Sequence, residues 1–380
     1  MADSTSGVDN VALETGLRKQ PWVRAVVYWL GAAIAVLHLV MNFTTIFSTQ
    51  WQSTLHFVGL GVLAILLYPP LRSDRLARSS QVLWLDIMLG IVFVVATLWV
   101  VWAEDAIYAR GVNMTGWEQL LALFTIIAVI ELTRRTTGVV IPILIVLALT
   151  YVVAWGGWLD NVFRFAGLSN QTLLFRSIYG DDALFGSIAQ ISVSFVFMFI
   201  LFGAFLVRSG AGDFVIAMAR AVAGRVVGGP GLVAVVSSGL TGTISGSAIA
   251  NTVSTGVITI PLMKRAGFPA RFAAGVEAAA STGGQLMPPI MGAGAFVMAS
   301  YTQIPYTHIV VVSVLPALLY FLSVAFFVRI EAKRLGFSVE STEEPTNLVT
   351  VMREGGIVFI LPITVLILML VSGFTPTYAA

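Results

Sequence analysis

The sequence predicts an all-α, polytopic integral membrane protein with about nine spans, one of them broken, and a re-entrant hairpin. Of the 380 residues, 58% are hydrophobic and 11% are charged, and the mean hydropathy is +0.92. Soluble chains carry roughly 25% charged residues. Residues 136–159 and 186–207 contain no Asp, Glu, Lys or Arg. Because about 20 apolar residues cross about 30 Å of hydrocarbon, these runs are expected to be membrane helices.

The distribution of charge predicts the topology of the first five spans, which are expected at residues 25–47, 54–71, 82–103, 117–132 and 139–158. Basic residues precede the first span and follow the second and the fourth, whereas the acidic pair Glu104 and Asp105 follows the third. Since Lys and Arg are enriched in cytoplasmic loops, the N-terminus is expected in the cytoplasm. The basic residues that carry this prediction are Arg18, Lys19, Arg24, Arg72, Arg75, Arg78, Arg134 and Arg135.

Residues 159–186 differ from the spans because charged and aromatic residues alternate along them, as Asp160, Phe163 and Arg164 show. This pattern is typical of an amphipathic helix that lies at a membrane interface, and we place it on the outer surface. A sixth span is expected at residues 187–207, and the basic residues that follow it mark the cytoplasmic side.

Residues 230–263 contain no charge, yet basic residues flank both ends, with Arg225 before and Lys264 after. The centre is rich in small and polar residues. Two halves of about 16 residues reach about 24 Å each, which is shorter than the hydrocarbon thickness. A single long helix would place the two basic ends on opposite sides of the membrane. The sequence therefore favours a re-entrant hairpin that begins and ends on the cytoplasmic side.

Residues 270–301 form a second interrupted apolar segment. A Ser-Thr-Gly-Gly-Gln run at 281–285 is followed by Pro288 and Pro289. Proline lacks a backbone donor and glycine permits unwinding, so the pattern predicts a broken span. Further spans are expected at residues 309–328 and 356–371, which gives an architecture like that of ion-coupled transporters.

The two interruptions predict one shared site, because unwound backbone within a membrane is tolerated only where it is buried in protein or lines a watery cavity. Carbonyl and hydroxyl oxygens there suit a sodium ion, and helix N-termini suit an anionic group. The alternative is that the small residues only allow close helix packing; the clustering with Pro288 and Pro289 favours a site. The candidate sodium and substrate residues are Ser245, Gly246, Ser247, Asn251, Ser281, Thr282, Gly283 and Gly284.

Glu277 is a further candidate, because it lies in the apolar stretch 272–280 and a carboxylate within a membrane segment is costly. Two interpretations remain open: Glu277 pairs with a cation or takes up a proton, or it has an intramolecular partner such as Arg271. Asp86 and Glu131 lie near the ends of their spans, where Arg135 and water can satisfy them. We expect these two to be structural.

Several classes of function are not expected. The chain contains no Cys, which excludes disulfides, thiol catalysis and thiolate metal sites. The three His residues are scattered in apolar segments and are expected to be satisfied locally. No phosphate-binding GxxxxGK[ST] motif and no plausible His–acid pair occur, so neither an enzyme nor a cofactor is expected. Basic residues lie in short clusters between spans, which does not indicate a nucleic-acid partner.

Four segments after the first spans resemble one protein family. They are residues 245–251 (SGSAIAN), 258–268 (ITIPLMKRAGF), 277–285 (EAAASTGGQ) and 287–293 (MPPIMGA). They resemble the large membrane subunit of tripartite ATP-independent periplasmic (TRAP) transporters. Residues 202–206 (FGAFL), 228–230 (GGP) and Glu131 with Arg134, Arg135 and Gly138 are similar to permeases in which the small and large subunits are fused.

The resemblance implies a small-subunit-like four-helix domain at 1–135 and the N-terminal part of a large permease subunit at 136–380. It also implies a sodium-coupled secondary transporter of the bacterial inner membrane that imports a small organic anion of the carboxylate type. Its partners would be membrane lipid and a periplasmic solute-binding protein, commonly of the TAXI class. A membrane scaffold that does not transport is the alternative, but it leaves the polar clusters within the spans unexplained.

The family's large subunit has two inverted repeats, each with a hairpin, whereas residues 187–380 supply one hairpin and one broken span. From this resemblance we expect a C-terminally truncated member that inserts into the membrane but does not transport.

Overall fold

The computed structural model of the protein describes residues 21–70, 80–111, 113–337 and 347–380. The regular structure of these residues is helical, with no strand, and eight of their helices are long and apolar enough to cross a membrane. The predicted all-α, polytopic class is therefore confirmed. Arg18, Lys19 and the basic residues at 72–78, whose charges entered the topology prediction, lie outside the described residues.

Packing divides the chain into two compact units, residues 1–193 and 194–380. This division reflects which residues pack against one another. The predicted boundary at residue 135, between a small-subunit-like domain and the large-subunit part, rests on family resemblance and stays a prediction.

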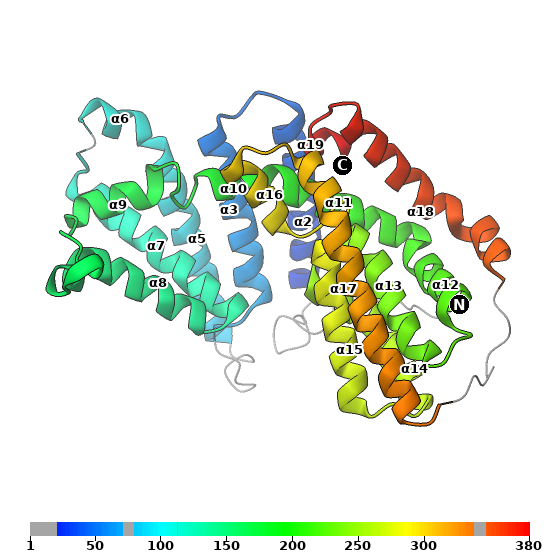
Figure 1. Ribbon diagram of the computed structural model, residues 1–380. Coiled ribbons are helices and arrows are strands. Elements are labelled where there is room, and N and C mark those ends of the chain that lie inside the picture. Colours follow the sequence, from blue (N-terminus) through cyan, green and yellow to red (C-terminus); the bar gives the residue numbers. More distant parts are fainter. Residues whose placement is uncertain (1–20, 71–79, 112, 338–346) are drawn as a thin grey trace. The chain divides into compact units, whose positions relative to one another are not determined.

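The first unit contains the first five predicted spans (Figure 1). Their helices are α2 (Pro21–Phe43), α3 (Thr49–Leu67), α5 (Ser80–Trp102), α7 (Gly116–Thr137) and α8 (Val140–Thr150). The helical path of α8 continues through a π-helical turn, η2 (Tyr151–Trp155), and a 3₁₀ turn, η3 (Gly156–Trp158). Helices α2, α3, α5 and α7 pack against one another in chain order. Each predicted span thus corresponds to a helix, with ends shifted by a few residues.

Helix α7 shows why the predicted ends shift. It begins with a capping box in which Thr115 and Glu118 satisfy each other's backbone donors. It was expected to end at Leu132, before the basic residues, but it continues to Thr137 because Glu131 accepts hydrogen bonds from both Arg134 and Arg135. Gly138, with φ +90°, ends it.

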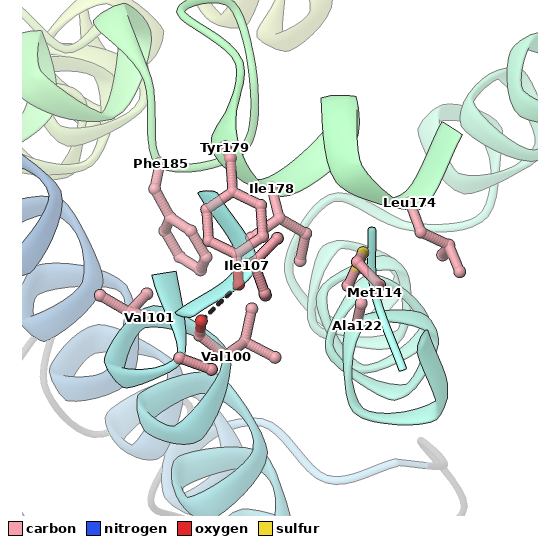
Figure 2. Packing of buried hydrophobic residues seen from close by; sticks show 10 residues of the cluster. Val100, Val101, Ile107, Met114, Ala122, Leu174, Ile178, Tyr179 and Phe185 are labelled. Carbon is pink, nitrogen blue, oxygen red and sulfur yellow. Dashed lines mark hydrogen bonds between the residues drawn. The ribbon is translucent and has the colours of Figure 1, made fainter. Parts of the chain in front are cut away.

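The predicted interfacial segment, residues 159–186, contains one helix of more than one turn, α9 (Asn170–Tyr179). Its apolar residues Leu174, Ile178 and Tyr179 are buried against α5, α7 and the short helix α6 (Glu104–Ala109), as Figure 2 shows. The Tyr179 hydroxyl donates to Val100 O, and burial raises its pKa, which keeps it a donor. The segment thus contains an amphipathic helix whose apolar face packs against protein, and its place at the outer membrane interface stays a prediction.

The sixth predicted span is helical but irregular. It comprises α10 (Ser187–Ile191), a π-helical turn η5 (Ser192–Val196) and α11 (Phe197–Leu206). A second π-helical turn, η6 (Val207–Ala211), contains a kink at Gly210, whose φ is +99°, and α12 (Gly212–Ala223) follows. Gly210 allows the chain to turn in a conformation that L side chains rarely adopt. The helical path therefore extends well past the predicted end at 207.

The hairpin and the broken span form the centre of the second unit. Helices α13 (Gly229–Ser245) and α14 (Ala248–Arg265) are joined by Gly246 and Ser247 and pack along each other. Helix α15 (Ala270–Gly283) packs on both, continues as a 3₁₀ turn η7 (Gly284–Leu286), and is separated from α16 (Ala293–Thr302) by residues 287–292. Both predicted interruptions are confirmed; the membrane side of the hairpin's ends stays a prediction.

Two long helices, α17 (Tyr306–Arg334) and α18 (Leu348–Val371), and one short helix, α19 (Pro376–Ala379), complete this unit (Figure 1). Helix α17 packs against α13 and α15, and α18 packs against α12 and the short α19. Glycines permit the closest approaches, since a Cβ on Gly231 would lie 2.5 Å from Val328 Cγ1 of α17. In lipid, such van der Waals packing holds helices together, because the hydrophobic effect does not.

Candidate functional site

The tip of the hairpin, residues 245–247, lies against the break in the second interrupted helix, residues 287–292. Gly246 ends α13 in the left-handed region, with φ +57°. A Cβ on Gly246 would lie 2.1 Å from Met291 O, and one on Gly292 would lie 3.3 Å from Gly246 O. Backbone atoms cannot move aside as a flexible side chain can, so the contact requires glycine. Two interruptions that are about 40 residues apart in sequence therefore meet in one place.

A second pair of glycines, Gly242 and Gly284, allows the same two segments to touch about one helical turn before the tip. A Cβ on Gly242 of α13 would lie 2.3 Å from Gly284 Cα, and a Cβ on Gly284 would lie 2.9 Å from Asn251 Nδ2. Gly283 faces α17, where an added Cβ would lie 2.3 Å from Tyr320 Cε1. The Gly283 and Gly284 run therefore serves close packing, and through that packing it brings the end of α15 to the hairpin tip.

Helix ends of both polarities converge at the tip. Helix α13 ends there, and α14 begins there with Ser247, whose hydroxyl accepts from Ala250 N. Helix α16 begins at Gly292, which touches Gly246. Helix C-termini carry partial negative charge and exposed carbonyl oxygens, and helix N-termini carry partial positive charge. The arrangement can therefore bind a cation and an anion side by side.

Two buried oxygen atoms of the hairpin have no hydrogen-bond partner among the described residues: Ser245 Oγ at the tip and Asn251 Oδ1 in the first turn of α14. Asn251 is fully buried, and its Nδ2 donates to Ser238 O at 2.8 Å. Because a carbonyl can only accept, this bond fixes the amide with Oδ1 turned away from Ser238. Oxygen atoms of this kind are the ligands that hard cations prefer.

The remaining candidates differ in their contacts. Ser247 caps α14, and Thr282 Oγ1 donates to Ala278 O of its own helix at 2.7 Å. Ser281 is buried and donates to Glu277 Oε1 at 3.1 Å. Pro288 and Pro289 lie in the break. The structure thus brings the backbone around 245–251 and 283–292 together, while the hydroxyls of Ser281 and Thr282 have partners of their own.

Sequence reasoning missed Tyr306, which anchors the break. Its buried hydroxyl lies 2.8 Å from Pro289 O and 2.7 Å from Ile290 O. The ring stacks on Phe296 of α16, with centroids 4.5 Å apart. These carbonyls have no partner within a regular helix, so the tyrosine satisfies backbone that the prolines leave open. Nothing in the sequence near 306 indicates this role.

Glu277 lies on α15 with no exposed surface, and its carboxylate accepts from four hydroxyl groups. These form the hydroxyl cluster: Ser238 at 3.0 Å, Ser281 at 3.1 Å, Thr255 and Thr259. Gly256 makes room, since a Cβ there would lie 3.1 Å from Glu277 Cγ. The partner is therefore intramolecular, but it is a set of hydroxyls rather than Arg271. Ser238, Thr255 and Thr259 were not candidates, although the i, i+4 spacing of the two threonines placed them on one face of α14.

The first unit contains the predicted partners of Asp86 and Glu131. Arg135 Nη2 lies 3.0 Å from Asp86 Oδ1, and Arg135 Nε lies 2.9 Å from Glu131 Oε1. The side chains of Arg135 and Asp86 are 2% and 5% exposed. Helices α5 and α7 are thus tied together by an ion pair, which fits the expected structural role.

Two of the three histidines hydrogen-bond to each other in the same unit. His38 Nδ1 lies 2.7 Å from Ile34 O, His38 Nε2 lies 2.7 Å from His56 Nδ1, and His56 Nε2 lies 2.9 Å from Ser192 Oγ. Ile34 O can only accept, so His38 Nδ1 carries the proton that it donates there. If both rings are neutral, His56 Nδ1 then donates to His38 Nε2, and the Ser192 hydroxyl donates to His56 Nε2. The pair is satisfied locally, as expected, and joins α2, α3 and η5.

Apolar helices of membrane-spanning length, together with a hairpin and a broken helix that meet at a polar tip, define a transporter-type membrane protein with discontinuous helices. Comparison with known families agrees: residues 124–380 match the family described as "Tripartite ATP-independent periplasmic transporter, DctM component". The chain belongs to this family. It is a component of a solute transporter and not an enzyme, and it is a multi-pass protein of the inner membrane.

Parts of the chain are similar to curated large permease proteins. A stretch of 106 residues is 37% identical to the C4-dicarboxylate TRAP transporter large permease protein DctM of Rhodobacter capsulatus, and covers 28% of this chain and 24% of that protein. A stretch of 139 residues is 32% identical to the Pseudomonas aeruginosa protein of the same description, and covers 36% and 32%. A putative TRAP transporter large permease of Haemophilus influenzae is 28% identical over 181 residues, which are 48% of this chain and 42% of that protein. The matched stretches thus span less than half of these relatives.

Proposed function

We propose that the protein forms part of the membrane permease of a sodium-coupled secondary transporter that imports a small organic anion of the carboxylate type. The observation that carries the proposal is the meeting of the hairpin tip with the broken helix, where helix ends of both polarities converge. The same hairpin carries two buried oxygens, Ser245 Oγ and Asn251 Oδ1, that have no hydrogen-bond partner among the described residues. Sodium is a co-transported substrate in this account. Its candidate ligands are Ser245 Oγ, Asn251 Oδ1 and carbonyl oxygens of the tip and the break.

The energetic cost of the two oxygens supports a cation site. A buried polar group without a partner costs about 1–3 kcal/mol, so Ser245 Oγ and Asn251 Oδ1 together cost roughly 2–6 kcal/mol. That is a large part of the 5–15 kcal/mol by which proteins are typically stable. A bound sodium ion would satisfy both oxygens and offset the cost. An alanine or leucine at these positions would be simpler if packing were the only requirement.

The helix N-termini support an anionic substrate. Each N-terminus stabilises a negative charge by about 0.3–1 kcal/mol at an exposed site and up to about 2 kcal/mol where it is partly buried. Helices α14 and α16 both begin at the contact between Gly246 and Gly292. The Rhodobacter and Pseudomonas relatives are described as C4-dicarboxylate permeases, which favours a carboxylate.

For partners and orientation, we propose a periplasmic solute-binding protein of the TAXI class that delivers the anion, and an N-terminus in the cytoplasm. The family's description as a tripartite periplasmic transporter supports a periplasmic partner. The similarity of residues 202–206 and 228–230 to fused permeases favours the TAXI class. The acidic pair Glu104 and Asp105 between α5 and α7, and Arg134 and Arg135 at the end of α7, support a cytoplasmic N-terminus through the positive-inside rule.

A membrane scaffold that does not transport is the competing function. The apolar helices and α9 suit such a role equally well. It does not require the close glycine contacts between Gly242 and Gly284 or the partnerless oxygens of the hairpin.

The test is sodium-specific stabilisation of the purified chain in detergent. Thermal unfolding is followed by tryptophan fluorescence, using the nine Trp residues, in sodium, potassium or choline chloride at equal ionic strength. Sodium at 100 times its Kd adds about 2.7 kcal/mol to the free energy of unfolding. We expect a higher melting temperature in sodium alone, and a further rise when succinate or another small carboxylate is added but not when the corresponding amide is added.

Equal melting temperatures in the three salts would favour the scaffold. A sodium effect without any carboxylate effect would leave the cation site in place and contradict the substrate class.

A further inference from the structure

We propose that Glu277 is the positioning residue of the hairpin-tip cation site: it does not bind the ion, but fixes the Asn251 amide so that Oδ1 is free for it. The inference rests on the proposed sodium site. What motivates it is a continuous set of hydrogen bonds from the Glu277 carboxylate, through Ser238 and Thr255, to the side chain and the backbone of Asn251.

The carboxylate joins three helices. Ser238 comes from α13, Thr255 and Thr259 come from α14, and Ser281 comes from α15, which also carries Glu277. All five residues are buried. Because every member of the hydroxyl cluster donates to the same carboxyl group, a shift of any one helix along another would break at least one of these bonds.

Asn251 is joined to this cluster across helices through Ser238, and within α14 it contacts Thr255, whose single hydroxyl proton is shared between Asn251 O and Glu277 Oε1. Ser238 Oγ donates to Glu277 Oε1 at 3.0 Å, and Ser238 O accepts from Asn251 Nδ2 at 2.8 Å. Thr255 Oγ1 lies 2.8 Å from Asn251 O and also contacts Glu277 Oε1. The carboxylate therefore fixes the position of Asn251 relative to Ser238 of α13.

The orientation of the amide follows from the same contacts. If it were flipped, Asn251 Oδ1 would face Ser238 O, and two acceptor oxygens would repel each other. With Nδ2 facing Ser238 O, Oδ1 stays buried and without a partner among the described residues. A ligand oxygen that is already oriented binds a cation without paying for its immobilisation, which raises affinity.

Glu277 itself is not placed to be a ligand. Oε1 already accepts from Ser238, Thr255 and Ser281, and Oε2 accepts from Thr259. The residue has no exposed surface. A cation would have to displace these hydroxyls, whereas Asn251 Oδ1 and Ser245 Oγ are available as they stand.

Chemistry suggests that glutamine can replace Glu277 in this role. In a Glu277→Gln variant, Oε1 still accepts from Ser238, and the amide nitrogen can donate to Thr259 Oγ1. The Thr259 hydroxyl then donates to Thr255 O, which lies 3.0 Å away. In a Glu277→Ala variant, residue 277 can make none of these side-chain hydrogen bonds. If Glu277 acts by positioning through hydrogen bonds, the glutamine variant should keep its affinity for sodium and the alanine variant should lose it.

The experiment titrates sodium into the purified full chain and records the concentration that gives half of the thermal stabilisation, with the melting temperature in potassium as a separate readout. We expect Glu277→Ala to raise this concentration about tenfold or more, since a hydrogen bond to a carboxylate is worth about 1.5–3 kcal/mol and 1.4 kcal/mol is a factor of ten. Glu277→Gln should stay within about threefold of the unaltered chain.

A serine pair provides a matched control in case Glu277→Ala does not fold. Ser237 and Ser238 are neighbours on α13 and are both fully buried, but Ser237 Oγ donates only to Ala234 O of its own helix, at 3.1 Å. We expect Ser238→Ala to raise the half-stabilising sodium concentration several-fold, and Ser237→Ala to leave it unchanged.

The results of these titrations distinguish failure of the proposed sodium site from failure of the proposed role of Glu277. If the unaltered chain shows no sodium-specific stabilisation, the sodium site fails and this inference fails with it. If it does, but Ser238→Ala and Glu277→Ala only lower the melting temperature without changing the half-stabilising concentration, the role of Glu277 is structural and the inference is wrong. Equal loss in Glu277→Gln and Glu277→Ala would show that charge acts rather than positioning, and would also overturn it.

Discussion

Gly242 of the hairpin and Gly284 of the broken helix are in backbone contact, since a Cβ on Gly242 would lie 2.3 Å from Gly284 Cα. This contact holds α13 against the end of α15 and thereby places the hairpin tip beside the break. Neither glycine has a positive φ, so their role is close approach rather than an unusual backbone conformation.

Gly242→Ala is therefore expected to destabilise the second unit by about 1–3 kcal/mol or more, because overpacking against backbone cannot relax by a side-chain movement. Gly275→Ala is the control: Gly275 lies in α15 with nothing within 4 Å of an added Cβ. There alanine should stabilise the helix by about 0.5–1 kcal/mol. Thermal unfolding in potassium measures both, and equal stability of the two variants would contradict the close contact.

The buried ion pair between Arg135 and Asp86 gives a prediction for the first unit. Asp86→Asn weakens one of the two carboxylate partners of Arg135, while Glu131 still pairs with it, so we expect a cost of about 1–3 kcal/mol. We expect a clear fall in the melting temperature. Replacement of both residues by apolar ones of similar size should recover much of it.

The control for that pair is the variant Arg334→Ala. In the unaltered chain, Arg334 Nη1 lies 3.7 Å from Glu331 Oε2, and the Arg334 side chain is 79% exposed. Exposed pairs contribute little to stability, so the melting temperature should barely change. A larger effect of Arg334→Ala than of Asp86→Asn would show that the Arg135 pair is not the tie between α5 and α7.

The re-entrant topology predicts that Arg225 and Lys264 lie on the same, cytoplasmic side. Both residues are exposed, and the chain has no cysteine, so Arg225→Cys and Lys264→Cys each create a single reactive thiol. A membrane-impermeant maleimide should label neither variant in intact cells and both in inside-out vesicles. Labelling of one variant alone from the periplasm would mean that α13 and α14 cross the membrane as a single unit.

Because the Ser245 hydroxyl has no hydrogen-bond partner among the described residues, its removal should raise the stability of the protein and lower its affinity for sodium. Ser245→Ala removes a buried oxygen without a partner, so the protein should be about 1–3 kcal/mol more stable in potassium. The same variant should need more sodium for stabilisation. A loss of stability in potassium with unchanged sodium response would show that the hydroxyl has a structural partner instead.

The sequence carried enough information to predict the two interruptions. Absence of charge between Arg225 and Lys264, together with the shortness of each half, predicted the hairpin, and Pro288 with Pro289 predicted the break. These signals are local, since they depend on which backbone groups are available and which residues tolerate lipid. The ends of the long helices were less predictable. Helix α18, for example, begins at Leu348 rather than 356, because a helix continues past the hydrocarbon into charged residues such as Arg353.

The chemistry around the site depended on contacts between helices. The hydroxyls of Ser238, Thr255 and Thr259 are ordinary within their own segments, and only the packing of α13, α14 and α15 brings them to Glu277. The same holds for Tyr306 and the carbonyls of the break. The π-helical turn at Ser192–Val196 also had no sequence signal, because it arises from one extra residue in a turn rather than from a residue type.

The central claim is that Ser245 and Asn251 bind sodium where the hairpin tip meets the break. Equilibrium binding of radioactive sodium to the purified chain, in an excess of potassium, tests it most directly. We expect saturable binding by the unaltered chain, and binding at least tenfold weaker by a Ser245→Ala, Asn251→Ala double variant that has the same helical content, since two ligand oxygens are lost. Equal sodium binding by the folded double variant and the unaltered chain would contradict the claim.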